Sequence, residues 1–258
     1  MDKKLLQSLK LEQQFQFKGF DFSHLRHRMQ DEPLPWSYVS SVIKAIRAAK
    51  APVMLDIGTG GGEILSEMRP LPKKTFATES YKPNIKVARD KLAPLGVKVI
   101  VTKGEDELPF PDSYFDLVID RHSAFKSKEV SRVLKKGGLF ITQQVASNSN
   151  CYMQDLLGMK DVPWTKKDSL KFYTDELKRA KMKVIKAVEA YPKTRFYDTA
   201  AIVYYLKGVP WVIPDFSIKK YAKALERIDN KIDKKGYVEV GGHSVFFIAK
   251  KPEPSRPA

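Results

Sequence analysis

The sequence is 258 residues long, with 43% hydrophobic and 29% charged residues, which is ordinary for a globular protein and enough to bury a substantial core. Basic residues outnumber acidic residues by 46 to 30, and this net charge of +16 makes polyanions candidate partners. The single cysteine, Cys151, excludes an intrachain disulfide and a thiolate metal cluster, and charges and prolines interrupt the apolar region 196–214, which excludes a membrane span. We therefore expect a soluble, cytoplasmic protein.

Apolar runs alternate with amphipathic stretches from residue 51 to residue 190. The apolar runs predict strands at 51–57, 74–79, 97–102, 114–120, 138–145 and 183–190. The stretches between them predict helices at 63–68, 83–95, 128–134 and 165–179, and a last strand follows at 243–249. Alternation of this kind is typical of an α/β fold with a parallel sheet and crossover helices.

Two regions lie outside this alternation. Residues 1–50 are predicted to form a helical N-terminal cap, and residues 191–237 a helical insertion before the last strand. The core is then 51–190 together with 238–250, followed by a disordered tail at 251–258. An insertion of that size, anchored at both ends in the core, is typical of a segment that covers a binding site, so we expect a lid at 191–237.

The strongest motif is the run VMLDIGTGGGE, which follows the first predicted strand and precedes the first predicted helix. A glycine-rich turn in that context is typical of a site for a nucleotide-like ligand. Gly58 and Gly60 would let the backbone approach the ligand where a Cβ would clash. Asp56 ends the first strand and can accept from an amine or a hydroxyl, and Glu79 ends the second strand at the distance expected for ribose hydroxyls.

Two kinds of ligand fit such a turn: a nicotinamide dinucleotide, and a methyl donor that carries an amine, a sulfonium and a ribose. A dinucleotide places its pyrophosphate on the helix N-terminus, where negative neighbours are unfavourable. Glu63 lies in the first helical turn, and Asp56 precedes the glycines. The motif therefore favours the methyl donor.

Three motifs carry a resemblance to a known family. They are LDIGTGGGE (residues 55–63), LPFPDSYFDLVI (108–119) and EVSRVLKKGGLFIT (129–142). Across residues 50–145 the sequence resembles the class I, S-adenosylmethionine-dependent methyltransferases of the UbiE-like group. The resemblance implies a Rossmann-like, seven-stranded, mostly parallel sheet with an antiparallel last strand. It also implies S-adenosyl-L-methionine as the donor and S-adenosyl-L-homocysteine as the product, and it leaves the acceptor open.

The resemblance assigns donor contacts by position. Asp56, Gly58 and Gly60 would contact the methionine part of the donor. Glu79 would bind its ribose.

The loop that contains Glu105 and Asp106 would frame the adenine. Here the sequence departs from the family, because the acidic residue commonly placed for the adenine amino group falls on Gly104, and Glu105 or Asp106 would substitute for it. Lys136 also stands where the family commonly has proline, a change that we expect to be harmless.

The acceptor is expected beside the methyl group at the carboxyl end of the fourth strand, where the sequence has Asp120, Arg121 and His122. A general base is needed only when the acceptor carries a proton at neutral pH. His122 is the candidate base because imidazole titrates near that pH, although a histidine at a strand end is often structural. Arg121 would orient a carboxylate, a phosphate or a base edge, or it would brace the loop by pairing with Asp120.

Two amides and three aromatic side chains are predicted to contact the acceptor: Gln143, Gln144, Trp36, Tyr197 and Trp211. One of the two glutamines should point away from the site, because side chains alternate across a strand. Aromatic rings fit a flat acceptor, although most aromatic residues belong to a core. The histidines have no acidic or cysteine neighbours at ligand spacing, so no metal site is predicted.

The prediction of the acceptor rests on charge. Residues 166–186 carry eight basic and three acidic residues, and residues 219–235 carry seven and three. These counts favour RNA, in particular a base of ribosomal RNA whose phosphates are held by Lys and Arg of the C-terminal part. Because no recognised RNA-binding appendage is present, a small molecule beneath a lid formed by 1–50 and 191–237 is the alternative. A third possibility is a regulatory module that only binds the donor, but no feature of the sequence specifically supports it.

Overall fold

In the computed structural model of the chain, the described residues are 1–17, 19, 21–49, 52–104, 107–146, 148–159 and 169–253. They belong to two compact units. Unit 1 comprises Met1–Leu34, Ala146–Lys166 and Ala190–Ser244, and unit 2 comprises Pro35–Val145, Lys167–Glu189 and Val245–Ala258. No helix within the described ranges is both long enough and apolar enough to cross a membrane. Residues 251–253 adopt neither helix nor strand, and the remainder of the predicted tail, 254–258, lies outside the described residues.

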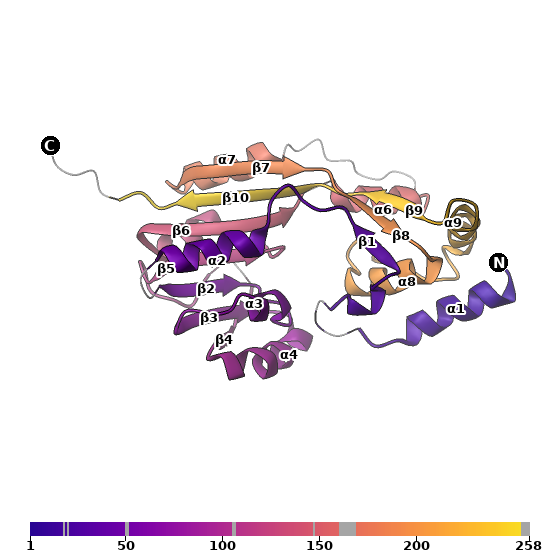
Figure 1. Cartoon of the computed structure of the whole chain (residues 1–258), viewed down its shortest axis with the longest axis horizontal. Coiled ribbons are helices and arrows are strands. Elements are labelled where there is room, and N and C mark those ends of the chain that lie inside the picture. The colour runs from indigo at the N-terminus through magenta and orange to yellow at the C-terminus, as the bar shows by residue number, and fades with distance from the viewer. Residues whose placement is uncertain are drawn as a thin grey trace. The chain divides into compact units, whose positions relative to one another are not determined.

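Unit 2 is built on a seven-stranded sheet with the strand order β4-β3-β2-β5-β6-β10-β7 (Figure 1). The strands are β2 (Val53–Ile57), β3 (Lys74–Glu79), β4 (Lys98–Val101), β5 (Phe115–Arg121), β6 (Leu134–Val145), β7 (Lys183–Ala190) and β10 (Ser244–Lys250). The pairs β2·β3, β2·β5, β3·β4 and β5·β6 are parallel. Figure 1 shows β10 running opposite to its two neighbours. The predicted seven-stranded, mostly parallel sheet with an antiparallel last strand is confirmed.

Helices cover both faces of this sheet, as buried parallel strands require. They are α2 (Tyr38–Ala48), α3 (Glu63–Glu67), α4 (Lys82–Leu92), α5 (Ser127–Val133) and α7 (Ser169–Arg179). On one face, Val42 of α2 and Leu92 of α4 share a fully buried cluster with Ile119 of β5. On the opposite face, Tyr173 of α7 packs against Phe247 of β10, with ring centroids 5.9 Å apart.

The predicted bounds agree closely with the observed ones, and β3 and β7 begin and end where the sequence predicts. The helix predicted at 83–95 ends at Leu92 and continues as a 3-10 turn over Ala93–Leu95, because Pro94 cannot donate to the preceding turn. The strand predicted from residue 138 begins earlier, at Leu134. The helix predicted at 165–179 is described from Ser169 onward, and its first four residues lie outside the described ranges.

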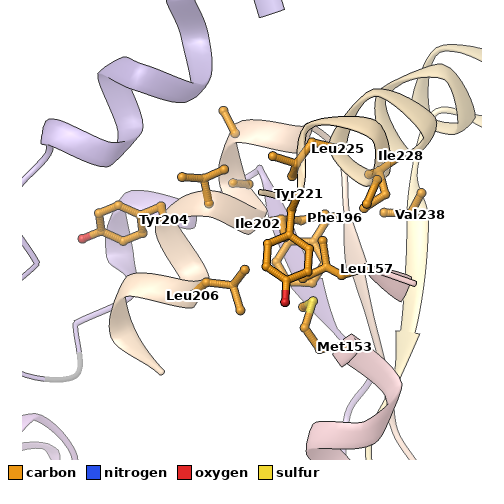
Figure 2. Packing of buried hydrophobic residues seen from close by; sticks show 14 of the residues in the cluster. Met153, Leu157, Phe196, Ile202, Tyr204, Leu206, Tyr221, Leu225, Ile228 and Val238 are labelled. Atoms are coloured by element: carbon orange, nitrogen blue, oxygen red, sulfur yellow. The ribbon is translucent and has the colours of Figure 1, made fainter. Parts of the chain in front are cut away.

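Unit 1 combines a buried helix with a small antiparallel sheet. Its elements are α1 (Lys3–Gln14), η1 (Ser23–Leu25), β1 (Met29–Asp31), α6 (Ser149–Leu156), β8 (Lys193–Phe196), α8 (Thr199–Gly208), α9 (Ala222–Lys235) and β9 (Val238–Gly241). Figure 2 shows Ile202 and Leu206 of α8 in one cluster with Leu225 and Ile228 of α9 and Phe196 of β8. Because α8 is buried along most of its length, it forms the centre of this unit.

The sheet of unit 1 has the order β1-β8-β9, and both of its strand pairs are antiparallel. The sequence patterns do not predict these three strands. Each is only three or four residues long, too short to show a clear alternation of polar and apolar residues. The β1·β8 pair also joins distant segments, since Asp31 pairs with Thr194.

A charged network joins α1 to α8 within unit 1. Arg28 donates to Glu12 Oε1 at 2.6 Å and to the two carboxylate oxygens of Asp198 at 2.7 and 2.8 Å. Asp198 also caps α8, because its Oδ1 accepts from the backbone N–H of Ala201 at 2.7 Å. Hydrogen bonds to Asp198 and Glu12 raise the pKa of Arg28 above its ordinary value. One guanidinium therefore fixes both α1 and the beginning of the buried helix.

Candidate functional site

Three buried carboxylates lie at one edge of the sheet of unit 2. Asp56 belongs to β2, Glu79 ends β3, and Asp120 lies near the end of β5. Their exposed fractions are 7%, 5% and 0%. Because β3, β2 and β5 are parallel neighbours, their carboxyl ends meet at the same edge, which is where α/β sheets bind ligands. The structure therefore brings together side chains that lie far apart in the sequence.

The glycine-rich turn follows β2 at this edge and needs glycine for its backbone conformation. Gly58 and Gly60 have φ angles of 61° and 64°, in the left-handed region that other residues adopt at a cost. The turn is held against β3, because the N–H of Gly58 donates to Thr78 Oγ1 at 3.1 Å and that of Thr59 to the Thr78 carbonyl at 2.9 Å. A Cβ on Gly58 would collide with the side chain of Ser123. Gly58 therefore brings the backbone close to a neighbouring side chain, and the left-handed φ angle of Gly60 favours glycine there as well.

The surroundings of Asp56 favour its neutral form. Burial, and then the negative charge of Glu79, raise the pKa of Asp56 to about 7. A ligand that brings a positive charge or hydrogen-bond donors to this edge would favour the ionised form again. The arrangement therefore suits a ligand with an amine or hydroxyl groups.

Glu79 is oriented by the backbone that follows it. Its Oε1 accepts hydrogen bonds from the N–H groups of Ser80 at 2.9 Å and Tyr81 at 2.7 Å. These contacts hold the carboxylate at the end of β3, because the two donors belong to the residues that immediately follow the strand. The side chain is thus fixed before any ligand binds.

Asp120 is held by the neighbouring strand β6. Its Oδ1 accepts from Thr142 Oγ1 at 3.3 Å and from Gln144 Nε2, and Gln144 Nε2 also donates to Thr142 Oγ1 at 2.8 Å. Among the described residues, its Oδ2 has no hydrogen-bond partner. Burial, and then the charge of Asp56, raise the pKa of Asp120 well above its ordinary value. The environment therefore favours a protonated carboxyl group.

His122 and Gln143 form a second polar group in unit 2, with Trp36. Trp36 Nε1 donates to Gln143 Oε1 at 2.9 Å, and Gln143 Nε2 lies 3.1 Å from His122 Nε2. Because the amide nitrogen can only donate, His122 Nε2 must accept, which places the ring proton on Nδ1. Desolvation of the ring, and then the charge of Arg121, lower the pKa of His122. The residue as a whole is solvent-exposed, so water offsets part of this effect.

The two glutamines therefore have different partners, as alternation along β6 requires. Gln143 is held by Trp36 and contacts His122, whereas Gln144 contacts Asp120. Both amides are buried, with 4% of each residue exposed.

Tyr38 is a candidate site residue that the sequence patterns do not indicate. It is the first residue of α2, only 5% of it is exposed, and its Oη has no hydrogen-bond partner among the described residues. Burial, and then the charges of Asp56 and Asp120, raise its pKa well above the ordinary value. A buried hydroxyl without a partner costs free energy, so its retention beside two carboxylates points to a ligand contact. The sequence does not indicate this role, because the position of Tyr38 on the same helix face as Val42 is typical of a core residue.

The other predicted site residues are placed as follows. Tyr197 and Trp211 belong to unit 1, where Tyr197 Oη donates to Gln30 Oε1 at 2.6 Å and Trp211 is 55% exposed. Glu105 and Asp106, predicted for the adenine, lie outside the described residues. Among the residues that the structure describes, no group of three or more His, Cys, Asp or Glu side chains could hold a metal ion.

Part of the core is similar to known proteins. Residues 55–142 match the family model described as "Methyltransferase domain". YcgJ of Bacillus subtilis, named an uncharacterized methyltransferase, is 33% identical over 97 residues, which are 34% of this chain and 38% of YcgJ. The ubiquinone/menaquinone biosynthesis C-methyltransferase UbiE of Chromobacterium violaceum is 32% identical over 120 residues, which are 42% of this chain and 48% of UbiE. The chain thus spans less than half the length of either relative.

Solved structures share the fold over more of the chain. The crystal structure of YcgJ aligns with a TM-score of 0.57 at 20% identity, over 84% of this chain and 98% of that chain. A geranyl diphosphate methyltransferase in complex with S-adenosylmethionine aligns with a TM-score of 0.50 at 12% identity, over 83% of this chain and 84% of that chain. At these identities the similarity shows the fold alone.

Asp56→Asn tests the burial of this carboxylate. An unfolded chain releases the Asp proton near pH 4, whereas folded Asp56 holds it to about pH 7. Its stabilising contribution is therefore present below about pH 4 and is lost as the pH rises to about 7. Relative to the parent, the variant should gain roughly 2–3 kcal/mol of unfolding free energy between about pH 5 and pH 8.

Denaturant unfolding at several pH values measures this difference. The exposed aspartate Asp155, changed to Asn, serves as the matched control and should show no such dependence on pH. An Asp56→Asn variant whose stability runs parallel to that of the parent at every pH would contradict the prediction.

Proposed function

We propose that this chain, whose core belongs to the class I S-adenosylmethionine-dependent methyltransferases, transfers a methyl group from S-adenosylmethionine to an acceptor at the carboxyl edge of β5 and β6. The observation that carries the proposal is the set of buried carboxylates beside the glycine turn. A dinucleotide pyrophosphate would add further negative charge beside these carboxyl groups, whereas an amine, a sulfonium and ribose hydroxyls complement them.

Two observations support the fit of these residues to the donor. Tyr38 Oη and Asp120 Oδ2 are buried polar atoms without hydrogen-bond partners among the described residues, and Asp56 gains its charge readily when a cationic or donor group approaches. We assign the methionine part to Asp56 and to the backbone at Gly58 and Gly60, and the ribose to Glu79. The assignment of the adenine to Glu105 or Asp106 stays a prediction.

When bound, the donor supplies an already activated methyl group, so the protein mainly has to align the acceptor. Asp120 is suited to that task, since Thr142 and Gln144 both contact its Oδ1. A protonated Asp120 would carry its hydrogen on Oδ2 and could donate it to an acceptor oxygen or nitrogen. Arg121 follows Asp120 directly and could orient an anionic group or a base edge.

His122 remains the proposed base for an acceptor that must lose a proton. Its lowered pKa weakens it in that role, because general bases work best with a pKa near the working pH. The contact with Gln143 suits an orienting role equally well. A role for Trp36, Gln143 and Gln144 in reading the acceptor also stays a prediction.

For the acceptor we propose RNA, in particular ribosomal RNA, on the strength of the basic C-terminal part. The alternative is a small molecule, and the observation in its favour is the similarity to UbiE, named a C-methyltransferase of ubiquinone/menaquinone biosynthesis. The prediction that residues 191–237, with Tyr197 and Trp211, cover the acceptor stays a prediction.

Glu79→Gln tests the donor assignment. The variant keeps an oxygen for the N–H groups of Ser80 and Tyr81 but loses the negative charge for the ribose hydroxyls. Calorimetry with S-adenosylhomocysteine should show binding weakened by about 1.5–3 kcal/mol. The exposed Glu67, changed to Gln, should bind as the parent does. Undetectable binding of S-adenosylhomocysteine to the parent would refute the proposed function.

Tyr38→Phe separates a ligand contact from a structural role. Removal of a buried hydroxyl that has no partner should leave the ligand-free protein equally stable, or more stable by up to about 1 kcal/mol. Binding of S-adenosylhomocysteine or the rate of methyl transfer should fall by roughly 0.5–1.5 kcal/mol. The exposed Tyr81, changed to Phe, provides the control. Lower stability with unchanged binding and transfer would assign Tyr38 to the core.

Donor labelled in its methyl group tests the acceptor class. Incubation with ribosomal RNA lacking its own modifications, and separately with a low-mass cell extract, should place the label in the RNA. The Glu79→Gln variant should incorporate less label at limiting donor, because the donor site is the same in both reactions. Label found only in the low-mass fraction would decide for the small-molecule acceptor.

A further inference from the structure

The helix α9 of unit 1 has one apolar face and one basic face. Leu225, Ile228 and Ile232 are buried in the cluster that also contains α8, and Figure 2 shows Leu225 and Ile228 directed into that cluster. The opposite face is solvent-exposed. The packing of unit 1 therefore fixes which side of α9 remains available for a partner.

Four basic side chains and one amide lie on the exposed face: Lys223, Arg227, Asn230, Lys231 and Lys234. Their spacing of three or four residues places them on one side of the helix. Together with Glu226 they line a shallow, open recess of about 400 Å³. At a rise of about 1.5 Å per residue, the cations extend over roughly 16 Å along the helix. We call these five residues the basic strip.

The acidic residues of α9 offset the strip only in part. Asp229 accepts a hydrogen bond from Thr199 Oγ1 at 2.6 Å, and Glu226 lies 2.7 Å from the amino group of Met1. Asp233 is exposed beside the strip. In the part of the chain that the structure describes, no acidic side chain forms an ion pair with Lys223, Lys231 or Lys234. The strip therefore keeps a net positive charge.

We propose that the basic strip of α9 binds the phosphate groups of an RNA strand. The proposal rests on the proposed function, for which it supplies the place where a polyanionic acceptor is held. Lysine and arginine contacts to phosphates provide affinity without reading the sequence, and the amide of Asn230 adds a neutral donor to the row. One strand of double-stranded DNA carries a phosphate about every 3.4 Å along the helix axis, and at a spacing of that order a cationic row of this length would lie beside several phosphates.

Arg227 gives the strip a fixed point. Its guanidinium donates to the carbonyl of Leu156 at 3.2 Å and keeps further N–H groups for a ligand. The contact joins α9 to the end of α6, so one cation of the strip is held in place before a strand binds.

An anionic membrane surface fits α9 less well. A helix that lies on a membrane inserts its apolar face, and here that face is buried in the core of unit 1. None of the large hydrophobic residues exposed in the described part of the chain lies in α9. The available surface therefore offers charge and hydrogen-bond donors without an apolar anchor.

The test uses the full chain with Lys223 and Lys231 both changed to Gln. Arg227 is left unchanged, because its contact with Leu156 contributes to the fold. The matched control changes Lys3 and Lys10 of α1 to Gln, which removes the same charge from exposed positions of the same unit. Thermal unfolding and calorimetry with S-adenosylhomocysteine confirm that both variants fold and that donor binding is unchanged.

Binding of a short fluorescent single-stranded RNA is measured by anisotropy between about 50 and 200 mM salt. Each phosphate contact steepens the slope of log affinity against log salt by about 0.7, so the strip variant should flatten it by about 1.4. Its affinity at the lowest salt should fall severalfold. The α1 variant should keep the slope and affinity of the parent.

Three results would overturn the proposal: no RNA binding by the parent at low salt, equal losses in both double variants, or binding of vesicles rich in anionic lipid in preference to RNA. A competition experiment with poly-glutamate gives a fourth such result. If poly-glutamate displaces the RNA at equal charge concentration, the strip would serve acidic protein segments instead. Failure of S-adenosylhomocysteine to bind the parent, with RNA binding intact, would refute the proposed methyl transfer and leave the RNA site standing.

Discussion

The burial of Asp56, Glu79 and Asp120 at one edge of the sheet is the constraint on which the rest of unit 2 depends. A carboxylate that leaves water loses solvation worth several kcal/mol unless hydrogen bonds or a proton replace it. The chain does this differently at each position: backbone N–H groups serve Glu79, an amide and a hydroxyl serve Asp120, and Asp56 keeps its proton to about pH 7. Stability alone would favour apolar residues at such strand ends, which is why we propose that these three carboxyl groups serve a ligand.

Parallel pairing and side-chain alternation together divide this edge into two polar groups. Asp120 lies opposite Thr142 in the β5·β6 pair, and the amide two residues further along, Gln144, reaches the same carboxylate. The intervening Gln143 is instead held by Trp36, which precedes α2. Side chains on one face of β6 thus position the carboxyl group of Asp120. The side chain of Gln143, on the other face, contacts the imidazole of His122. The orientation of each group depends on the register, and a slip by one residue would exchange their surroundings.

The sequence predicts unit 2 better than unit 1 for a physical reason. Buried parallel strands appear as continuous apolar runs, and a glycine turn between a strand and a helix is a local signal, so β2 and the turn at Gly58 are predictable. The pairing of Asp31 with Thr194 depends on contacts between distant segments, and no local pattern contains it. The sequence does not indicate Tyr38 as a site residue for a related reason, because its position in the helix is typical of a core residue. Only the structure shows that its hydroxyl lacks a partner among the described residues. Alternation along β6 likewise predicts that Gln143 and Gln144 point to opposite faces. It does not predict that Gln144 is the one that contacts Asp120.

The arrangement of charge on a surface predicts the binding of a polyanion better than the net charge of the chain does. The stretch 166–186 is as rich in lysine and arginine as α9, yet two of its cations are occupied within α7: Lys171 pairs with Asp175, and Arg179 pairs with Glu176. Further along this stretch, Lys186 lies over the ring of Phe246, at 5.5 Å from its centroid. In α9 the acidic residues lie beside or behind the basic strip, and the helical period brings the cations onto one exposed side. Two segments with similar composition therefore present different surfaces, and an extended anion would be attracted most strongly where the helix gathers cations without neutralising them.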